Sequence, residues 1–174
     1  MNKTINSLRS GLAAVATVGL VLSGASAFAA DTVILEGTVA PVNTVEVVGV
    51  AGVYNLLDLT TTQTALKVAD VLETSNDTIG YTVTLRSANA AVTTQAVLKG
   101  AVVGNTQGMD YAITYGPGAG TAVTLIAGIA TVTDSAVATE EAGTANNLYI
   151  AYTGNTFLQA DTYTDTITLT IAAK

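Results

Sequence analysis

The sequence Tyr163-Thr164-Asp165-Thr166-Ile167-Thr168-Leu169-Thr170-Ile171 alternates in side-chain type near the end of the chain. Threonine occupies every even position, whereas Ile167, Leu169 and Ile171 share the odd face. Successive side chains of a β-strand point to opposite faces, so a period of two indicates a strand with one buried and one solvated face. We predict that this last strand is central to the core and that Ile167, Leu169 and Ile171 are buried there.

The same alternation recurs in three earlier segments, 79–85, 109–115 and 148–152. Their apolar positions are Ile79, Tyr81, Val83 and Leu85, then Met109, Tyr111, Ile113 and Tyr115, then Leu148, Ile150 and Tyr152. The run Gly116-Pro117-Gly118-Ala119-Gly120 follows the second segment and predicts a turn. We therefore expect residues 109–127 to form a hairpin.

Two further strand candidates, 33–39 and 44–48, lie near the front of the chain and are separated at Pro41. Residues 66–72 form another, although their apolar positions would also suit a short helix. The segments recur at intervals of roughly 8–15 residues, which is typical of all-β sandwiches. We predict an all-β fold, an immunoglobulin-like antiparallel β-sandwich of about 7–9 short strands.

The beginning of the chain has the pattern of a secretory signal peptide. Two cations, Lys3 and Arg9, precede an apolar run over 12–22, and Ala27-Phe28-Ala29 supplies the small residues of a cleavage site. We predict cleavage after Ala29 and export to the cell surface, the extracellular space or the periplasm. The predicted organisation is a signal peptide over 1–29, an N-terminal strand over 30–41 and a sandwich domain over 42–174.

Charge excludes several kinds of partner. Beyond the leader the only cations are Lys67, Arg86, Lys99 and Lys174, against 13 Asp and Glu residues in the chain. Nucleic acid and anionic lipid repel a surface of this charge, so neither is an expected partner. No later stretch reaches about 18 uninterrupted apolar residues, so no membrane insertion is expected.

The chain has no His, Cys or Trp. Without His a nucleophilic triad lacks its base, and without His or Cys a zinc site lacks its preferred ligands. We therefore expect no enzyme, no catalytic residue, no cofactor and no metal. One alternative is a calcium site in which Asp161 and Asp165 are joined by Asp134 or Glu140-Glu141. We favour solvated carboxylates at the start of a strand.

Several short segments, taken in chain order, form a series that covers most of the chain beyond the leader. They are Gly37-Thr38-Val39-Ala40-Pro41, Val45-Glu46-Val47, Gly52-Val53-Tyr54, Ser75 to Leu85 with Ser87-Ala88-Asn89, Leu98-Lys99-Gly100, Tyr111 to Gly116, and Tyr163 to Thr166. In this order they resemble the secreted fimbrial-subunit-like domains typified by spore coat protein U and archaic chaperone–usher pilins.

The resemblance implies a structural subunit of a cell-surface fimbria, coat or biofilm-matrix fibre. In assembled members, an N-terminal strand of one subunit completes the open sheet of the next, and a periplasmic chaperone and an usher assist. Residues 30–41 would be this donor strand, with Val33, Leu35 and Val39 as apolar plugs and Gly37 permitting close backbone approach. The implied partners are identical or related subunits.

Two alternatives remain. The segment over 30–39 would equally suit the first strand of a self-complete domain. Such a domain would act as an extracellular or periplasmic binding module for a glycan or a protein. Tyr149, Tyr152 and Phe157, near the turn at Gly154-Asn155, would then form a small stacking platform.

Overall fold

A computed structural model describes residues 34–90 and 94–174, and all of the regular structure in these ranges is β-strand. The predicted signal peptide over 1–29 lies outside the described residues, as do residues 30–33. The chain divides into two compact units, residues 1–38 and 39–174, and every described strand belongs to the second. In the ranges described, no helix is long and apolar enough to span a membrane.

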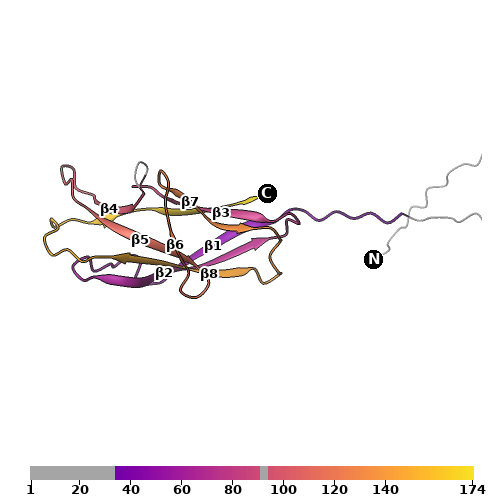
Figure 1. Cartoon of the computed structure of the whole chain (residues 1–174), viewed down its shortest axis with the longest axis horizontal. Coiled ribbons are helices and arrows are strands. Elements are labelled where there is room, and N and C mark those ends of the chain that lie inside the picture. Colours follow the sequence, from indigo (N-terminus) through magenta and orange to yellow (C-terminus); the bar gives the residue numbers. More distant parts are fainter. Residues whose placement is uncertain (1–33, 91–93) are drawn as a thin grey trace, which may run out of the picture. The chain divides into compact units, whose positions relative to one another are not determined.

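Ten strands, all paired antiparallel, make up two sheets in the described residues (Figure 1). The larger sheet has the order β1-β2-β8-β5-β4-β9, with β6 paired to β5, and the smaller sheet has the order β10-β3-β7. Their bounds are β1 (Asn43–Gly49), β2 (Gln63–Ser75), β3 (Tyr81–Ser87), β4 (Ala96–Gly100), β5 (Gly108–Gly116), β6 (Thr121–Val123), β7 (Ile129–Ser135), β8 (Thr144–Tyr152), β9 (Tyr163–Thr164) and β10 (Ile167–Ala173). The all-β antiparallel sandwich expected from the sequence is confirmed.

Alternating side chains place the core between the two sheets. In β3, the side chains of Tyr81, Val83 and Leu85 are buried, whereas Thr82 and Thr84 on the other face are half-buried. Strands β5 and β8 supply the facing layer, with Met109, Tyr111, Ile113, Tyr115, Leu148, Ile150 and Tyr152 all buried. The faces predicted for these three strands are therefore confirmed, apart from Ile79.

Ile79 is 61% exposed and precedes β3. The chain turns here, because the Asp77 carboxylate accepts the backbone N–H of Ile79 at 3.0 Å and Gly80 has a φ of 96°. A Cβ at Gly80 would lie 2.0 Å from the carbonyl oxygen of Ser135, so this turn requires glycine. The prediction that Ile79 shares the buried face is wrong, because Ile79 belongs to the turn before β3 and its side chain is exposed to solvent.

The predicted hairpin over 109–127 is confirmed. Its strands are β5 and β6, which pair from Ile113↔Val123 to Tyr115↔Thr121. The turn between them contains Gly120 at a φ of 66°, where a Cβ would lie 2.7 Å from the backbone of Tyr115. The alternation continues past β6 to Leu125, which is buried.

Residues 66–72 are a strand, and the helical alternative is wrong. They lie in the middle of the 13-residue β2, which pairs with β1 on one side and with β8 on the other. The β8 ladder runs from Gln63 to Glu73 and the β1 ladder from Ala69 to Ser75, so pairing with other strands overrides the helical spacing of the apolar residues.

The last strand differs from its prediction. It divides at Asp165–Thr166 into β9, which pairs with β4, and β10, which pairs with β3. Ile167, Leu169 and Ile171 do share one face opposite exposed threonines, but they are only half-buried. The expected central position is wrong, because β10 is the end strand of the smaller sheet and pairs only with β3 in the described residues.

Candidate functional site

Two end strands of the sandwich lie beside each other without being joined. Strand β1 ends the larger sheet and pairs with β2, and strand β10 ends the smaller sheet and pairs with β3. Their backbones come close together, yet no ladder connects them in the described residues. The outer edges of both strands therefore present backbone donors and acceptors that an added strand can pair with.

A hollow of about 370 Å³ is lined in part by the same two strands. Val47 and Gly49 of β1 and Ile167 of β10 line it. The remaining lining includes six buried core residues, Val68, Ala69, Leu98, Tyr111, Leu148 and Ile150. The hollow opens to solvent, and side chains of the core are reached from it. We call it the β1–β10 hollow.

Asp165 fixes one wall of the β1–β10 hollow where β9 passes into β10. Its Oδ2 accepts hydrogen bonds from the hydroxyls of Ser87 at 2.6 Å and Tyr111 at 2.7 Å, and its Oδ1 accepts the backbone N–H of Asn89 at 3.0 Å. Burial, reinforced by the hydrogen bond to Asp165, raises the pKa of Tyr111. The phenol therefore stays protonated and keeps donating, which holds the start of β10 in a fixed position.

The described residues before β1 form no strand. Ile34, Leu35 and Val39 are 89%, 91% and 87% exposed, and nothing lies within 4 Å of a Cβ built at Gly37. Of the predicted donor positions, Leu35, Gly37 and Val39 thus lie on exposed chain, and Val33 lies outside the described residues. The strand expected over 33–39 does not form in its described part, and β1 takes the place of the first strand.

The predicted aromatic platform does not assemble. Tyr149 and Tyr152 lie on opposite faces of β8 because their positions differ by an odd number, and Tyr152 is buried with its hydroxyl donating to the carbonyl of Asp58 at 3.1 Å. Phe157 is exposed. These three side chains therefore offer no common surface for a sugar ring.

A second, larger hollow lies at the loops that follow β1 and β8. Its volume is about 730 Å³, and its lining comes mainly from residues 54–60 and 155–165. Tyr54 and Tyr163 contribute aromatic rings, and Asp58 and Asp161 contribute carboxylates. No local sequence pattern indicates this loop hollow, because its two loops are far apart along the chain.

The acidic residues considered for calcium are bound by the protein itself. The Asp161 carboxylate accepts hydrogen bonds from the Val102 and Thr162 backbones and from the Asn105 amide at 2.7 Å, and these bonds, led by that from Val102, lower its pKa. Asp134 forms an ion pair with Lys174 at 2.5 Å. Asp161 and Asp165, interpreted from the sequence as solvated carboxylates, are both partly accessible and in addition fasten loops by hydrogen bonds. In the described residues no group of three acidic side chains is placed to hold a metal.

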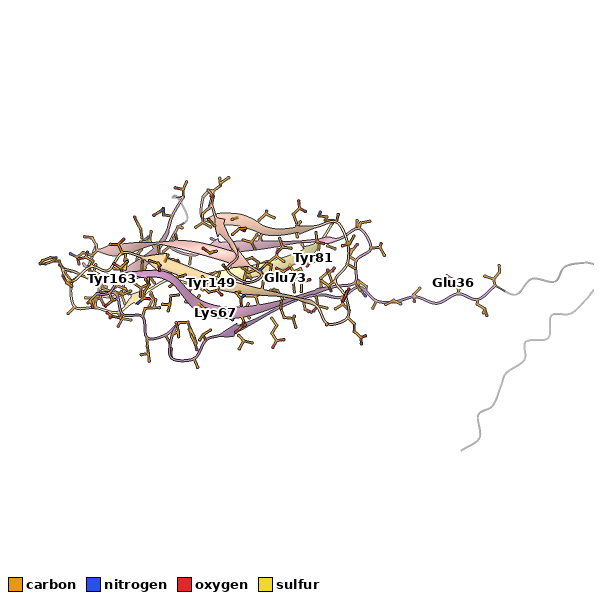
Figure 2. The ribbon with its side chains drawn as sticks, turned by 60° about the horizontal axis from the view of Figure 1, so that its bottom comes forward. Glu36, Lys67, Glu73, Tyr81, Tyr149 and Tyr163 are labelled. Carbon is orange, nitrogen blue, oxygen red and sulfur yellow. The ribbon has the colours of Figure 1, made fainter. Side chains whose placement is uncertain are left out.

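A buried carboxylate, Glu73, was missed by the sequence reasoning. It is fully buried on β2 and accepts hydrogen bonds from Tyr115 at 2.5 Å, Thr133 at 2.8 Å and Tyr81 at 3.0 Å. Figure 2 shows Glu73 beside Tyr81, and Tyr163 near the other end of the sandwich. Burial, followed by the hydrogen bond to Glu73, raises the pKa of Tyr115. The alternation of β2 contains a signal for it, because Ala69, Val71, Glu73 and Ser75 occupy every second position and so share the buried face of the strand.

No protein-family model matches the chain, and a comparison with curated proteins finds no match either.

Proposed function

We propose that this protein is a secreted, non-enzymatic structural subunit of a cell-surface fimbria, coat or biofilm-matrix fibre. Subunits assemble when the N-terminal strand of one enters the β1–β10 hollow of the next. The observation that carries the proposal is the pair of unjoined strands, β1 and β10, which flank a hollow lined by core side chains. A strand that enters there pairs with the free edge of β1 or of β10, and its side chains fill the hollow.

The donor segment has the required pattern and length. Val33, Leu35, Gly37 and Val39 occupy every second position, so they share one face of an extended segment. That face would present three apolar side chains to the neighbouring subunit, with glycine at the fourth position. Twelve residues over 30–41 extend for roughly 40 Å at about 3.3 Å per residue. This length exceeds that of the seven-residue β1 and β10.

Apolar burial supplies the driving force. Leu35 and Val39 are almost fully exposed in the single chain, and burying such a side chain contributes about 1.5–3 kcal/mol. Like charges oppose association, because the chain carries a net charge of −7. Strand pairing and apolar plugs, rather than charge, therefore hold the subunits together.

The signal-peptide pattern supports export, and the resemblance to chaperone–usher pilins supports a periplasmic chaperone and an usher as assembly partners. A chaperone of that kind would shield the β1–β10 hollow before a donor strand arrives. The absence of His and Cys from the sequence supports a role without catalysis.

Deleting residues 30–37 tests the proposal. The shortened chain should be a soluble monomer that unfolds at a lower temperature than assembled protein, because its hollow stays empty. A synthetic peptide of residues 30–41 should bind this monomer and raise its melting temperature, whereas a peptide with Asp at positions 33, 35 and 39 should not.

A different result would exclude strand exchange: the mature protein stays a monodisperse monomer at high concentration, and its melting temperature does not change when the peptide is added.

The loop hollow supports a second candidate function, a binding module. Its 730 Å³ lies within the range of small-molecule sites, and Tyr54 and Tyr163 line it together with polar side chains. Binding of an oligosaccharide that is lost in Tyr54→Ala, in a chain that does not assemble, would favour this candidate over the structural one.

A further inference from the structure

Asn76, which follows β2, holds the chain on both sides of Pro41. Its side-chain oxygen accepts the backbone N–H of Val42 at 2.7 Å, and its side-chain nitrogen donates to the carbonyl of Ala40 at 2.8 Å. The backbone N–H of Asn76 also donates to the carbonyl of Val42 at 3.1 Å. One residue thus makes three hydrogen bonds to a three-residue stretch, and we call this arrangement the Asn76 bracket.

The Asn76 bracket continues the line of β1. The β1–β2 ladder runs from Gly49↔Ala69 to Asn43↔Ser75, and the bonds between Val42 and Asn76 extend it by one further pair. Pro41, between the two bracketed residues, has its φ fixed near −65°, which further restricts the backbone there. Residues 40–42 are therefore held as an extension of β1 and cannot reverse the chain without breaking the bracket.

This geometry matters because a donor segment could insert into the β1–β10 hollow of its own chain instead of that of a neighbouring chain. The following inference rests on the proposed function. A segment tethered by a short flexible linker has an effective concentration on the order of millimolar, so at micromolar protein it would occupy its own hollow in preference to a neighbour's by about a thousandfold. Assembly requires geometry that removes this advantage.

We propose that Asn76, with Pro41, is a positioning residue that prevents self-insertion and so reserves residues 30–39 for a second copy of the chain. A return into the same hollow needs a reversal just before β1, at the residues that the bracket keeps extended. If the reversal moves toward Gly37, then Gly37 and Val39 lie in the turn, and only Val33 and Leu35 of the four donor positions can still enter the hollow.

The test releases the bracket in the mature chain. The variant Pro41→Gly/Asn76→Ala removes the fixed φ and both side-chain hydrogen bonds. We expect it to remain monomeric at micromolar concentrations at which the wild type assembles, as measured by light scattering after size-exclusion chromatography. Its affinity for the 30–41 peptide should fall at least 100-fold below that of the chain lacking residues 30–37, because its own segment occupies the hollow.

Three controls make the result specific. Asn147→Ala removes another side-chain amide bond, to the carbonyl of Gly118 at 3.0 Å, and should assemble like the wild type. Deleting residues 30–37 from the released variant should restore peptide binding, which shows that its sandwich is folded. Asn76→Asp keeps an acceptor for Val42 but loses the donor to Ala40, so it should shift the protein partly toward monomer.

Two outcomes overturn the proposal. If the released variant assembles and binds peptide as the wild type does, the bracket does not direct the segment. If the chain lacking residues 30–37 takes up no peptide even with Asn76 and Pro41 intact, the proposed function itself fails, and the role of Asn76 fails with it.

Discussion

Tyr111 donates its phenolic hydrogen to Oδ2 of Asp165 over 2.7 Å, and this bond ties the larger sheet to the start of β10 in the smaller one. Both residues also line the β1–β10 hollow. The same bond therefore supports the sandwich and shapes the proposed assembly site.

Replacing Tyr111 with Phe should destabilise the protein by about 1.5–3 kcal/mol. The ring and its packing remain, so the loss is that of a hydrogen bond to a charged acceptor in a buried setting. Urea unfolding measures the change, with Tyr54→Phe as the control because Tyr54 is exposed. Equal stabilities of the two variants would show that the bond to Asp165 contributes nothing.

Stability should fall at alkaline pH. Burial raises the pKa of Tyr111 and of Tyr115 above the ordinary value of 10.0, so the unfolded chain loses phenolic protons at a lower pH than the folded chain does. The stabilisation is complete below pH 10 and is lost above it, by up to about 1.4 kcal/mol per pH unit for each tyrosine. Melting temperatures measured across this range should decline less steeply in Tyr111→Phe/Tyr115→Phe. An equally steep decline in that variant would assign the alkaline transition to other groups.

Glu73 should be among the most sensitive positions of the fold. Glu73→Ala leaves the hydroxyls of Tyr81, Tyr115 and Thr133 without their acceptor in the core, and we expect a loss of at least ~3 kcal/mol. Glu73→Gln keeps one acceptor oxygen and should cost less. The control Glu46→Gln, on an exposed position of β1, should change the free energy of unfolding by no more than about 0.5 kcal/mol. Unfolding free energies that rank Glu46→Gln with Glu73→Ala would contradict the buried network.

Alternation was sufficient to predict the strands that pack one face against the core. Strands β3, β5 and β8 follow a period of two because each has one buried face, and their buried residues agree with the prediction. Strands β4 and β7 were missed, since β4 has only five residues and β7 has no buried residue to mark its inner face.

Less of the candidate site than of the fold could be predicted from the sequence. Leu35, Gly37 and Val39 were identified from local alternation, but the β1–β10 hollow depends on two strands from opposite ends of the chain becoming neighbours. The Asn76 bracket depends likewise on a contact between residues 34 and 36 positions apart. No local pattern contains such information.

Cleavage of the leader should produce a chain that begins Ala30-Asp31-Thr32-Val33. The reason is the spacing of Ala27 and Ala29 behind an apolar run of signal-peptide length. N-terminal sequencing of exported protein measures the start directly. Protein recovered outside the cell with Met1 intact would contradict both the cleavage and the length of the proposed donor segment.

The final prediction uses the pair Leu85 and Leu169, which lie opposite each other in the ladder between β3 and β10. Leu85 is fully buried and Leu169 is half-buried, so Leu85→Ala should cost about 3–5 kcal/mol and Leu169→Ala distinctly less, about 1–2 kcal/mol. Thr168→Ala, on the exposed face, should cost less than either. Urea unfolding of the chain lacking residues 30–37 gives this order without interference from assembly. If Leu169→Ala were as damaging as Leu85→Ala, β10 would be packed as a central strand, and no place would remain beside it for a donor.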